Sequence, residues 1–97
     1  MKYKLLSPFE FQLAMKKTGV VLLDLRDRED FEAYHLPGAI HAPYKDLNLW
    51  AGQFSTSQPL LVYCARGNDS ILAARDLAKR GFYVGTLLGG IERMNST

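Results

Sequence analysis

The sequence predicts an α/β protein, with a mostly parallel central sheet and helices on both of its faces. Two short apolar runs, "VVLLDL" at 20–25 and "LLVYC" at 60–64, are typical of strands buried on both faces. A third run, "YVGTLL" at 83–88, predicts the last strand. Helical segments separate these runs, and crossover connections of that kind place strands parallel. The order of the strands is not readable from the sequence.

The first helix is predicted from "SPFEFQLAMKK", residues 7–17. Ser7 has the features of an N-cap, Pro8 occupies the first helical position, and Glu10 completes a capping box. Gly19 marks the end of the helix. We expect its buried stripe to consist of Phe9, Leu13 and Ala14.

The segment between the first two strand runs is less regular. "DREDFEAYHLPGAIHAPY", residues 27–44, predicts a short acidic helix, a turn at its Pro-Gly pair and a brief strand at 39–42. "KDLNLWAGQF", residues 45–54, is predicted to be helical and is followed by a polar loop at 55–59. Four of its apolar side chains are available for burial, namely Leu47, Leu49, Trp50 and Phe54.

The last long helix is predicted from "SILAARDLAKRG", residues 70–81, with Gly81 as its C-terminal stop. Its apolar residues at helical spacing are Ile71, Ala74, Leu77 and Ala78. The chain has no internal repeat and no low-complexity linker, and its 97 residues are 47% hydrophobic. That is enough for one compact core, so we predict a single domain spanning residues 1–97.

Charge and composition narrow the function classes. The net charge is only +2, with acidic and basic residues intermixed, so no basic stripe indicates nucleic acid as a partner. The first residues carry two lysines and are followed by interrupted apolar positions, unlike a secretory signal, and no run is long enough to cross a membrane. A single cysteine cannot form an intramolecular disulfide, which suits a reducing compartment, and we expect a cytoplasmic protein without a membrane partner.

That cysteine, Cys64, ends the second strand run just before a polar loop that opens a helix. Ligands of open α/β sheets bind beyond the carboxyl ends of the strands. Gly67 and Asn68 tolerate unusual backbone angles, so successive amides of this loop could turn inward and hold an anion. The candidate substrate-binding loop comprises Ala65, Arg66, Gly67, Asn68, Asp69 and Ser70.

Magnitudes indicate what such a loop would do to the thiol. Amide hydrogen bonds to a charged group contribute about 1.5 to 3 kcal/mol each, whereas a helix terminus contributes about 0.3 to 2 kcal/mol. Two or three amides therefore outweigh the helix, and we expect Cys64 to be largely ionised near neutral pH. The alternative is that a strand-end cysteine is only a small buried hydrophobe. These residues alone leave both interpretations open.

Four stretches together resemble the rhodanese-like sulfurtransferases, in particular their small single-domain bacterial members. "LLDLR", with Asp24 and Arg26, resembles the family's Asp-x-Arg at a strand end. "DFEAYHLPGAIHAP" resembles its aromatic and acidic helix leading into His-x-Pro-Gly-Ala. "CARGNDS" fits the catalytic loop Cys-x-x-Gly-x-x-Ser, and "LLGGIERM" supplies the usual Gly-Gly pair with Gly89 and Gly90. Their order and separations cover nearly the entire chain.

The resemblance implies sulfur transfer through a persulfide on Cys64. The thiolate would take the outer sulfur of a donor, such as thiosulfate or a low-molecular-weight persulfide, and pass it to cyanide or to a thiol, including a partner protein's thiol. The terminal sulfur of a persulfide carries negative charge, which inward amides stabilise without a metal or an organic cofactor. We therefore predict no cofactor.

Three positions depart from the family pattern. Asp69 stands where many thiosulfate-using members carry a basic or small neutral residue, so it can repel a dianionic donor, whereas Arg66 can offset this repulsion. Tyr34 replaces the glycine that is common before the histidine. The aromatic residue expected after the Gly-Gly pair is missing or replaced by Met94. The choice of donor and the packing behind the loop are therefore open.

Asp24 and Arg26 are predicted to support the site as an ion pair or hydrogen-bonded brace rather than to react. His35 and His41 are interpreted as structural. Two histidines and one cysteine at these separations do not form a metal site, and the acids at 24–32 alternate with arginines as on a solvated helix face. We predict no metal.

Two other functions are weighed against sulfur transfer. The cell-cycle dual-specificity phosphatases share the rhodanese fold, but their loop reads Cys-x5-Arg and clamps phosphate with the arginine. Here Asp69 and Ser70 hold the corresponding positions, so phosphoryl transfer lacks its bidentate partner and is not expected. The stronger alternative is a non-catalytic binding or regulatory module. Such domains usually lose the cysteine, which this chain keeps.

Overall fold

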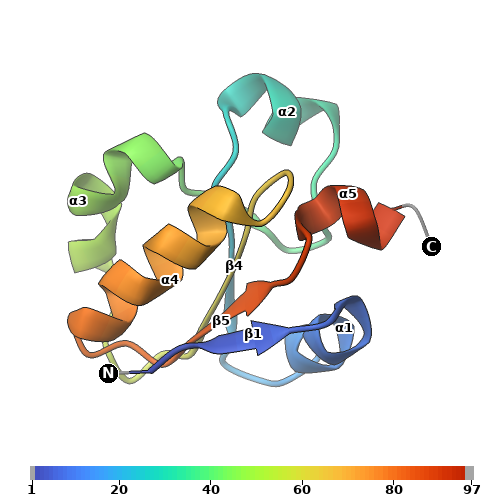
Figure 1. The fold of residues 1–97 in the computed structure, drawn as a ribbon. Coiled ribbons are helices and arrows are strands. Elements are labelled where there is room, and N and C mark those ends of the chain that lie inside the picture. The colour runs from blue at the N-terminus through green and yellow to red at the C-terminus, as the bar shows by residue number, and fades with distance from the viewer. Residues whose placement is uncertain (1, 96–97) are drawn as a thin grey trace.

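The computed structural model describes residues 2–95 as a five-stranded sheet with helices on both faces (Figure 1). The strand order is β1-β5-β4-β2-β3, and every pairing is parallel. This confirms the predicted α/β class and parallel sheet and adds the strand order. Residues 1 and 96–97 of the predicted domain lie outside the described residues. The strands are β1 (Lys4–Leu6), β2 (Val21–Asp24), β3 (Ile40–His41), β4 (Leu60–Tyr63) and β5 (Val84–Leu87).

The helices form two layers around this sheet. They are α1 (Pro8–Met15), α2 (Arg28–Ala33), α3 (Leu47–Trp50), α4 (Asn68–Lys79) and α5 (Gly90–Asn95), with 3-10 turns η1 (Tyr44–Asp46) and η2 (Ala51–Gln53) on either side of α3. Helices α3 and α4 cover one face and α1 and α5 the other, while α2 stands near the carboxyl ends of β2 and β4 (Figure 1). No helix among residues 2–95 is long and apolar enough to span a bilayer.

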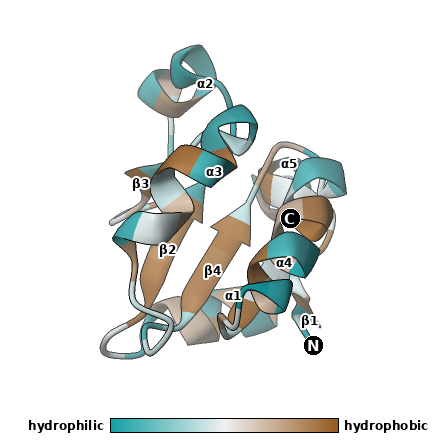
Figure 2. Ribbon diagram, turned by 90° about the vertical axis from the view of Figure 1, so that its left-hand side faces the viewer, coloured by the Kyte–Doolittle hydropathy of each residue, from teal (hydrophilic) through white to brown (hydrophobic). Residues whose placement is uncertain are grey.

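Strand β4 shows why the central runs are apolar throughout. Its four residues are all buried, and they alternate between the two core clusters that fill the two faces of the sheet. Leu60 and Val62 pack beneath α3 and α4, whereas Leu61 and Tyr63 pack beneath α1 and α5. Figure 2 shows the same continuous hydrophobic colour along β2 and β4.

The capping box predicted at the start of α1 is confirmed. The Glu10 backbone N–H donates to Ser7 Oγ at 3.2 Å, and the Ser7 backbone N–H donates to Glu10 Oε1 at 2.8 Å. The hydrogen bond from the Ser7 backbone lowers the pKa of Glu10 from its usual value. The buried stripe predicted for this helix is wrong at Phe9 and Leu13.

Phe9 and Leu13 are 70% and 49% exposed, whereas Phe11 is completely buried. Ala14, the third predicted member, is half-buried. Phe11 packs edge-on against Tyr63, with 6.3 Å between the ring centroids. The helix is only eight residues long, so one aromatic anchor decides which side faces the sheet, and the apolar spacing does not.

The segment at 45–54 also differs in part from its prediction. It is helical in three short pieces, and Leu47 and Trp50 are buried as expected, with Phe54 half-buried. Leu49 is 75% exposed, so its predicted burial is wrong. Trp50 is anchored because its Nε1 donates to the Pro43 carbonyl at 2.9 Å, which turns Leu49 outward.

Strand β1 and helix α4 also differ from the elements that the sequence predicts. Strand β1 is absent from the sequence-based prediction, because it is three residues long, carries a lysine and pairs only with β5 at the sheet edge. In α4, Ala74, Leu77 and Ala78 are buried as expected, but Ala73 is fully buried where Ile71 is only half-buried.

Candidate active site

The loop that joins β4 to α4 holds Cys64 against main-chain donors. The sulfur of Cys64 accepts hydrogen bonds from the backbone N–H of Gly67 at 3.1 Å and of Ser70 at 3.3 Å. The residue is 5% exposed. Two amides therefore converge on the sulfur, an arrangement that stabilises negative charge there. We call the main chain of residues 64–70 the cradle.

The backbone of Gly67 makes this geometry possible. Its φ of 102° lies in the left-handed region, and it serves as the N-cap residue of α4. A Cβ at Gly67 would lie 3.1 Å from the backbone nitrogen of Gly89, so the position is tight as well as conformationally unusual.

Two buried hydroxyl groups hold the cradle from the side of the sheet. Ser70 Oγ donates to the Gly67 carbonyl at 3.3 Å, and Thr86 Oγ1 of β5 donates to Ser70 Oγ at 2.8 Å. Both residues are 0% exposed. The sequence does not point to Thr86 as a site residue, because it lies in an apolar strand run and reaches the loop only through the pairing of β4 with β5.

The start of α5 closes the other side of the cradle. The backbone N–H of Ile91 donates to the Cys64 carbonyl at 2.9 Å, and that of Glu92 donates to the Ala65 carbonyl at 3.1 Å. Gly90 has a φ of 71°, and a Cβ there would lie 2.3 Å from the Ala65 carbonyl oxygen. Close backbone approach therefore explains the second glycine of the Gly-Gly pair.

Met94, at the other end of α5, is buried in the core cluster beneath α1 and α5. Its side chain fills space behind the helix that supports the cradle. This supplies apolar packing at the place where an aromatic residue was expected from the family pattern.

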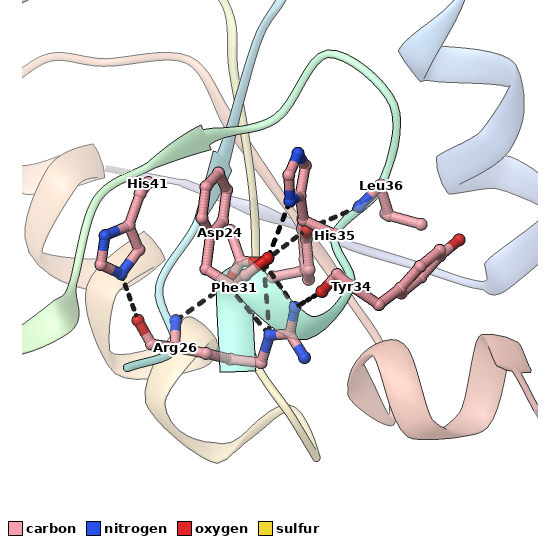
Figure 3. Close-up of polar contacts among 8 residues, drawn as sticks. Asp24, Arg26, Phe31, Tyr34, His35, Leu36 and His41 are labelled. Carbon is pink, nitrogen blue, oxygen red and sulfur yellow. Dashed lines mark hydrogen bonds and ion pairs between the residues drawn. The ribbon is translucent and has the colours of Figure 1, made fainter. Parts of the chain in front are cut away.

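Asp24 and Arg26 form the brace that the sequence predicts (Figure 3). Asp24 Oδ1 accepts from the Arg26 backbone N–H at 2.9 Å and from Nε at 3.1 Å. Its Oδ2 accepts from Arg26 Nη2 at 2.8 Å and from the Tyr63 hydroxyl at 2.6 Å. The guanidinium also donates to the Tyr34 carbonyl. The hydrogen bond to Asp24 raises the pKa of Arg26.

Tyr63 connects this brace to the end of β4, next to Cys64. Its hydroxyl donates to Asp24 and accepts from the Leu36 backbone N–H at 3.0 Å, and its side chain is completely buried. Burial, and then the hydrogen bond to Asp24, raises the pKa of the Tyr63 phenol. Because Tyr63 directly precedes Cys64, the brace fixes the point at which the cradle begins. In the sequence, Tyr63 reads only as part of an apolar run.

Both histidines contact α2 or the chain just before it (Figure 3). His35 Nδ1 lies 2.8 Å from the Phe31 carbonyl oxygen, and His41 Nε2 lies 2.7 Å from the Arg26 carbonyl oxygen. Their rings stack on Phe31 with centroid distances of 3.9 and 4.9 Å. Within residues 2–95, no three His, Cys, Asp or Glu side chains gather as a potential metal site.

A pocket of about 250 Å³ opens above Cys64. Four residues of the predicted loop line it, and Gly67 and Ser70 instead contact the sulfur from within the cradle. Arg26 is among the lining residues, whereas Asp24, its partner in the brace, is not. On the cradle side the lining residues are Cys64, Ala65, Arg66, Asn68 and Asp69, and on the opposite side they are Leu25, Arg26, Asp27 and Asp30.

The geometry can be compared with known proteins. The family model described as "Rhodanese-like domain" matches residues 7–97. The chain belongs to the rhodanese-like domain family. A thiosulfate sulfurtransferase of Coxiella burnetii is 34% identical to this rhodanese-like chain over 93 residues, which cover 95% of this chain and 87% of that protein. This relative supports rhodanese-type sulfur transfer as the class of chemistry.

Solved structures share the fold of this rhodanese-like chain. A rhodanese-related protein from Thermoplasma volcanium superposes with a TM-score of 0.88 at 21% identity, covering 97% of this chain and 92% of that one. An NAD-dependent persulfide reductase from A. fulgidus superposes with a TM-score of 0.70 at 26% identity. The match covers 93% of this chain but only 15% of the reductase, so it concerns one part of a larger protein.

Proposed function

We propose that this rhodanese-like domain transfers a sulfane sulfur, carried as a persulfide on Cys64. The observation that carries the proposal is that the Cys64 sulfur accepts hydrogen bonds from two backbone N–H groups while Cys64 lines an open pocket. A cysteine that served only packing would need neither the amides nor the pocket. The similarity to a thiosulfate sulfurtransferase supports the same chemistry.

The first half-reaction loads the sulfur. The Cys64 thiolate attacks the outer sulfur of the donor and forms a new S–S bond, while the donor's own S–S bond breaks. With thiosulfate, sulfite leaves with the electron pair of that bond. With an organic persulfide, the carrier leaves as a thiolate. No electron acceptor is required, because the transferred sulfur keeps its oxidation level.

The second half-reaction returns the enzyme to its starting state. A thiolate acceptor or cyanide attacks the outer sulfur of the Cys64 persulfide, and the Cys64–S bond breaks. The products are a new persulfide or thiocyanate, together with the regenerated Cys64 thiolate. Throughout the cycle the negative charge stays near the cradle, where main-chain donors stabilise it without reorganising.

Each remaining predicted residue has a place in this proposal. Ala65, Arg66, Asn68 and Asp69 line the pocket that receives the donor. The backbone N–H groups of Gly67 and Ser70 donate hydrogen bonds to the sulfur. Asp24 and Arg26 act as positioning residues, because they hold the ends of β2 and β4 together without contacting the sulfur.

Intact-mass measurement tests the proposal. Purified protein treated with thiosulfate or with a small persulfide should gain one sulfur atom, and cyanide should remove it with release of thiocyanate. Cys64→Ser is the matched control, because it keeps size and polarity but removes the thiolate, and it should gain nothing. If neither kind of donor loads the folded wild-type protein, the binding-module function replaces this proposal.

A further inference from the structure

The charges around the Cys64 pocket are not balanced. Three carboxylates line it, those of Asp27 and Asp30 on the α2 side and that of Asp69 at the start of α4. Among residues 2–95, none of the three takes part in an ion pair. We call these three side chains the acidic rim.

The two guanidinium groups of the lining do not compensate for this rim. Arg26 is held by Asp24, a fully buried carboxylate, at 2.8 Å. Arg66 is a highly exposed side chain whose Nε lies 3.4 Å from Glu92 Oε1, and Glu92 is not part of the lining. Each guanidinium therefore already has a carboxylate partner from outside the pocket, although Arg26 also feels the charge of Asp30. With those two partners counted, the carboxylates at the pocket outnumber the guanidinium groups.

We propose that the acidic rim selects the sulfur donor, and that the preferred donor is a small organic persulfide bearing an ammonium group, not a dianion such as thiosulfate. This inference rests on the function proposed above and names the substrate class of the same site. An ammonium group gains attraction from Asp27, Asp30 and Asp69. A dianion is repelled by all three.

The size of the effect follows from Coulomb's law. Two exposed unit charges several ångströms apart in water change an equilibrium by about two- to threefold, and a dianion doubles the exponent. Three carboxylates acting together therefore give at least about a tenfold preference, even after partial screening by salt. A pocket of about 250 Å³ has room for a small carrier.

The loading step is balanced for this donor. The Cys64 thiolate attacks the terminal sulfur of an ammonium-bearing R–S–SH, a new S–S bond forms between the Cys64 sulfur and that terminal sulfur, and the donor's own S–S bond breaks. The carrier thiolate leaves with the electron pair and takes up the proton released when the new persulfide ionises. The ammonium group stays on the carrier and departs with it.

The test uses persulfides that differ mainly in charge. Persulfides of cysteamine, 2-mercaptoethanol and 3-mercaptopropionate are cationic, neutral and anionic at their free ends, and thiosulfate is the dianionic probe. The rate at which each loads Cys64 is read by intact mass and divided by its rate with free N-acetylcysteine, which removes differences in intrinsic reactivity. The expected order is cationic, neutral, anionic and then thiosulfate, with at least tenfold between the first and the third.

Variants test whether the acidic rim causes this order of loading rates. Asp27→Asn/Asp30→Asn/Asp69→Asn keeps the shapes of the side chains and should bring the normalised rates within about threefold of one another, mainly by faster loading from the anionic donors. Glu29→Gln removes an acid of the same helix that does not line the pocket, and it should keep the wild-type order. Added salt should narrow the spread in the wild type but not in the triple variant.

The outcomes separate this inference from the proposed function. Equal normalised rates in the wild type, or an order that survives in the triple variant, overturn the selection by the rim while the loading itself upholds sulfur transfer. Loading by no donor overturns both. If the triple variant unfolds, Asp69→Asn alone should reduce the logarithm of the rate ratio between cationic and anionic donors by about a third, and an unchanged ratio in that variant also contradicts the inference.

Discussion

The cradle and the acidic rim face the same pocket, yet the cradle consists of backbone groups and the rim of side-chain carboxylates. The cradle acts through backbone N–H groups of buried residues, which β5, α5 and the brace hold from three sides. The rim acts through exposed carboxylates that carry no ion pairs among residues 2–95. The difference suggests a division of work, in which main-chain geometry decides whether sulfur is held and side-chain charge decides which donor delivers it.

This division has a physical basis. The position of a backbone N–H group is set by the packing of the chain around it. A substitution that displaces this donor therefore also disturbs the packing and the stability of the domain. An exposed charge acts through solvent, contributes little to stability and is easily replaced. Substitutions near the cradle should therefore disturb folding and loading together, whereas substitutions in the rim should change donor preference alone.

The largest effect is expected from Asp24→Asn. The change leaves the partly buried guanidinium of Arg26 without its carboxylate, and breaking such a pair costs about 3 to 5 kcal/mol. Urea unfolding measures the loss of stability, and the rate of persulfide formation should fall with it. Glu32→Gln, which removes one partner of the exposed Arg28 pair, is the control and should change stability by less than about 0.5 kcal/mol. A brace that mattered only for loading would leave the unfolding midpoint unchanged.

Gly90→Ala should come next. Its Cβ would lie 2.3 Å from the Ala65 carbonyl oxygen and 2.6 Å from the Arg66 nitrogen, so backbone atoms of the cradle must move. Because Gly90 also has a positive φ, we expect the free energy of unfolding to fall by about 2 to 4 kcal/mol. Loading of Cys64 with sulfur should become much slower. Gly52→Ala is the matched control, because no atom lies within 4 Å of its added Cβ. Loading at the wild-type rate in Gly90→Ala would show that the cradle does not depend on α5.

Alkaline pH should weaken the brace through Tyr63. Its pKa is raised in the folded protein by burial and by the bond to Asp24, so the folded state binds this proton more tightly than the unfolded state. The resulting stability is fully present below the unfolded value near 10 and is lost as the pH rises further, by up to about 1.4 kcal/mol per unit. Denaturant unfolding between neutral pH and about 11 measures the slope. Tyr63→Phe should lack this contribution, and equal slopes in the two proteins would contradict it.

The smallest change in stability is expected from Asp69→Asn. The side chain is exposed and forms no ion pair among residues 2–95, so the free energy of unfolding should change by less than about 0.5 kcal/mol. Its effect should instead appear as faster loading by thiosulfate relative to the cationic persulfide. A large loss of stability without a change in donor preference would contradict the claim that the rim affects donor preference and not stability.

Short-range patterns in the sequence predicted much of this molecule. The apolar runs, the capping box at Ser7 and the loop after Cys64 were all readable, because each depends on residues a few positions apart. Asp24 and Arg26 were singled out through the family's Asp-x-Arg motif and were then interpreted as an ion pair or hydrogen-bonded brace. The family resemblance brought in the Gly-Gly pair without explaining it.

Contacts between distant residues were decided only by the tertiary structure. The bond from Thr86 to Ser70, the bond from Tyr63 to Asp24 and the approach of Gly90 to Ala65 each join segments from different elements. The burial of Phe11 likewise depends on a distant residue, because its ring packs edge-on against Tyr63 of β4. Asp27 and Asp30 line the pocket only because the strand order places β2 next to β4. Local propensity acts over a few residues, whereas the assembly of a site depends on which surfaces pack together, and no single stretch of chain contains that information.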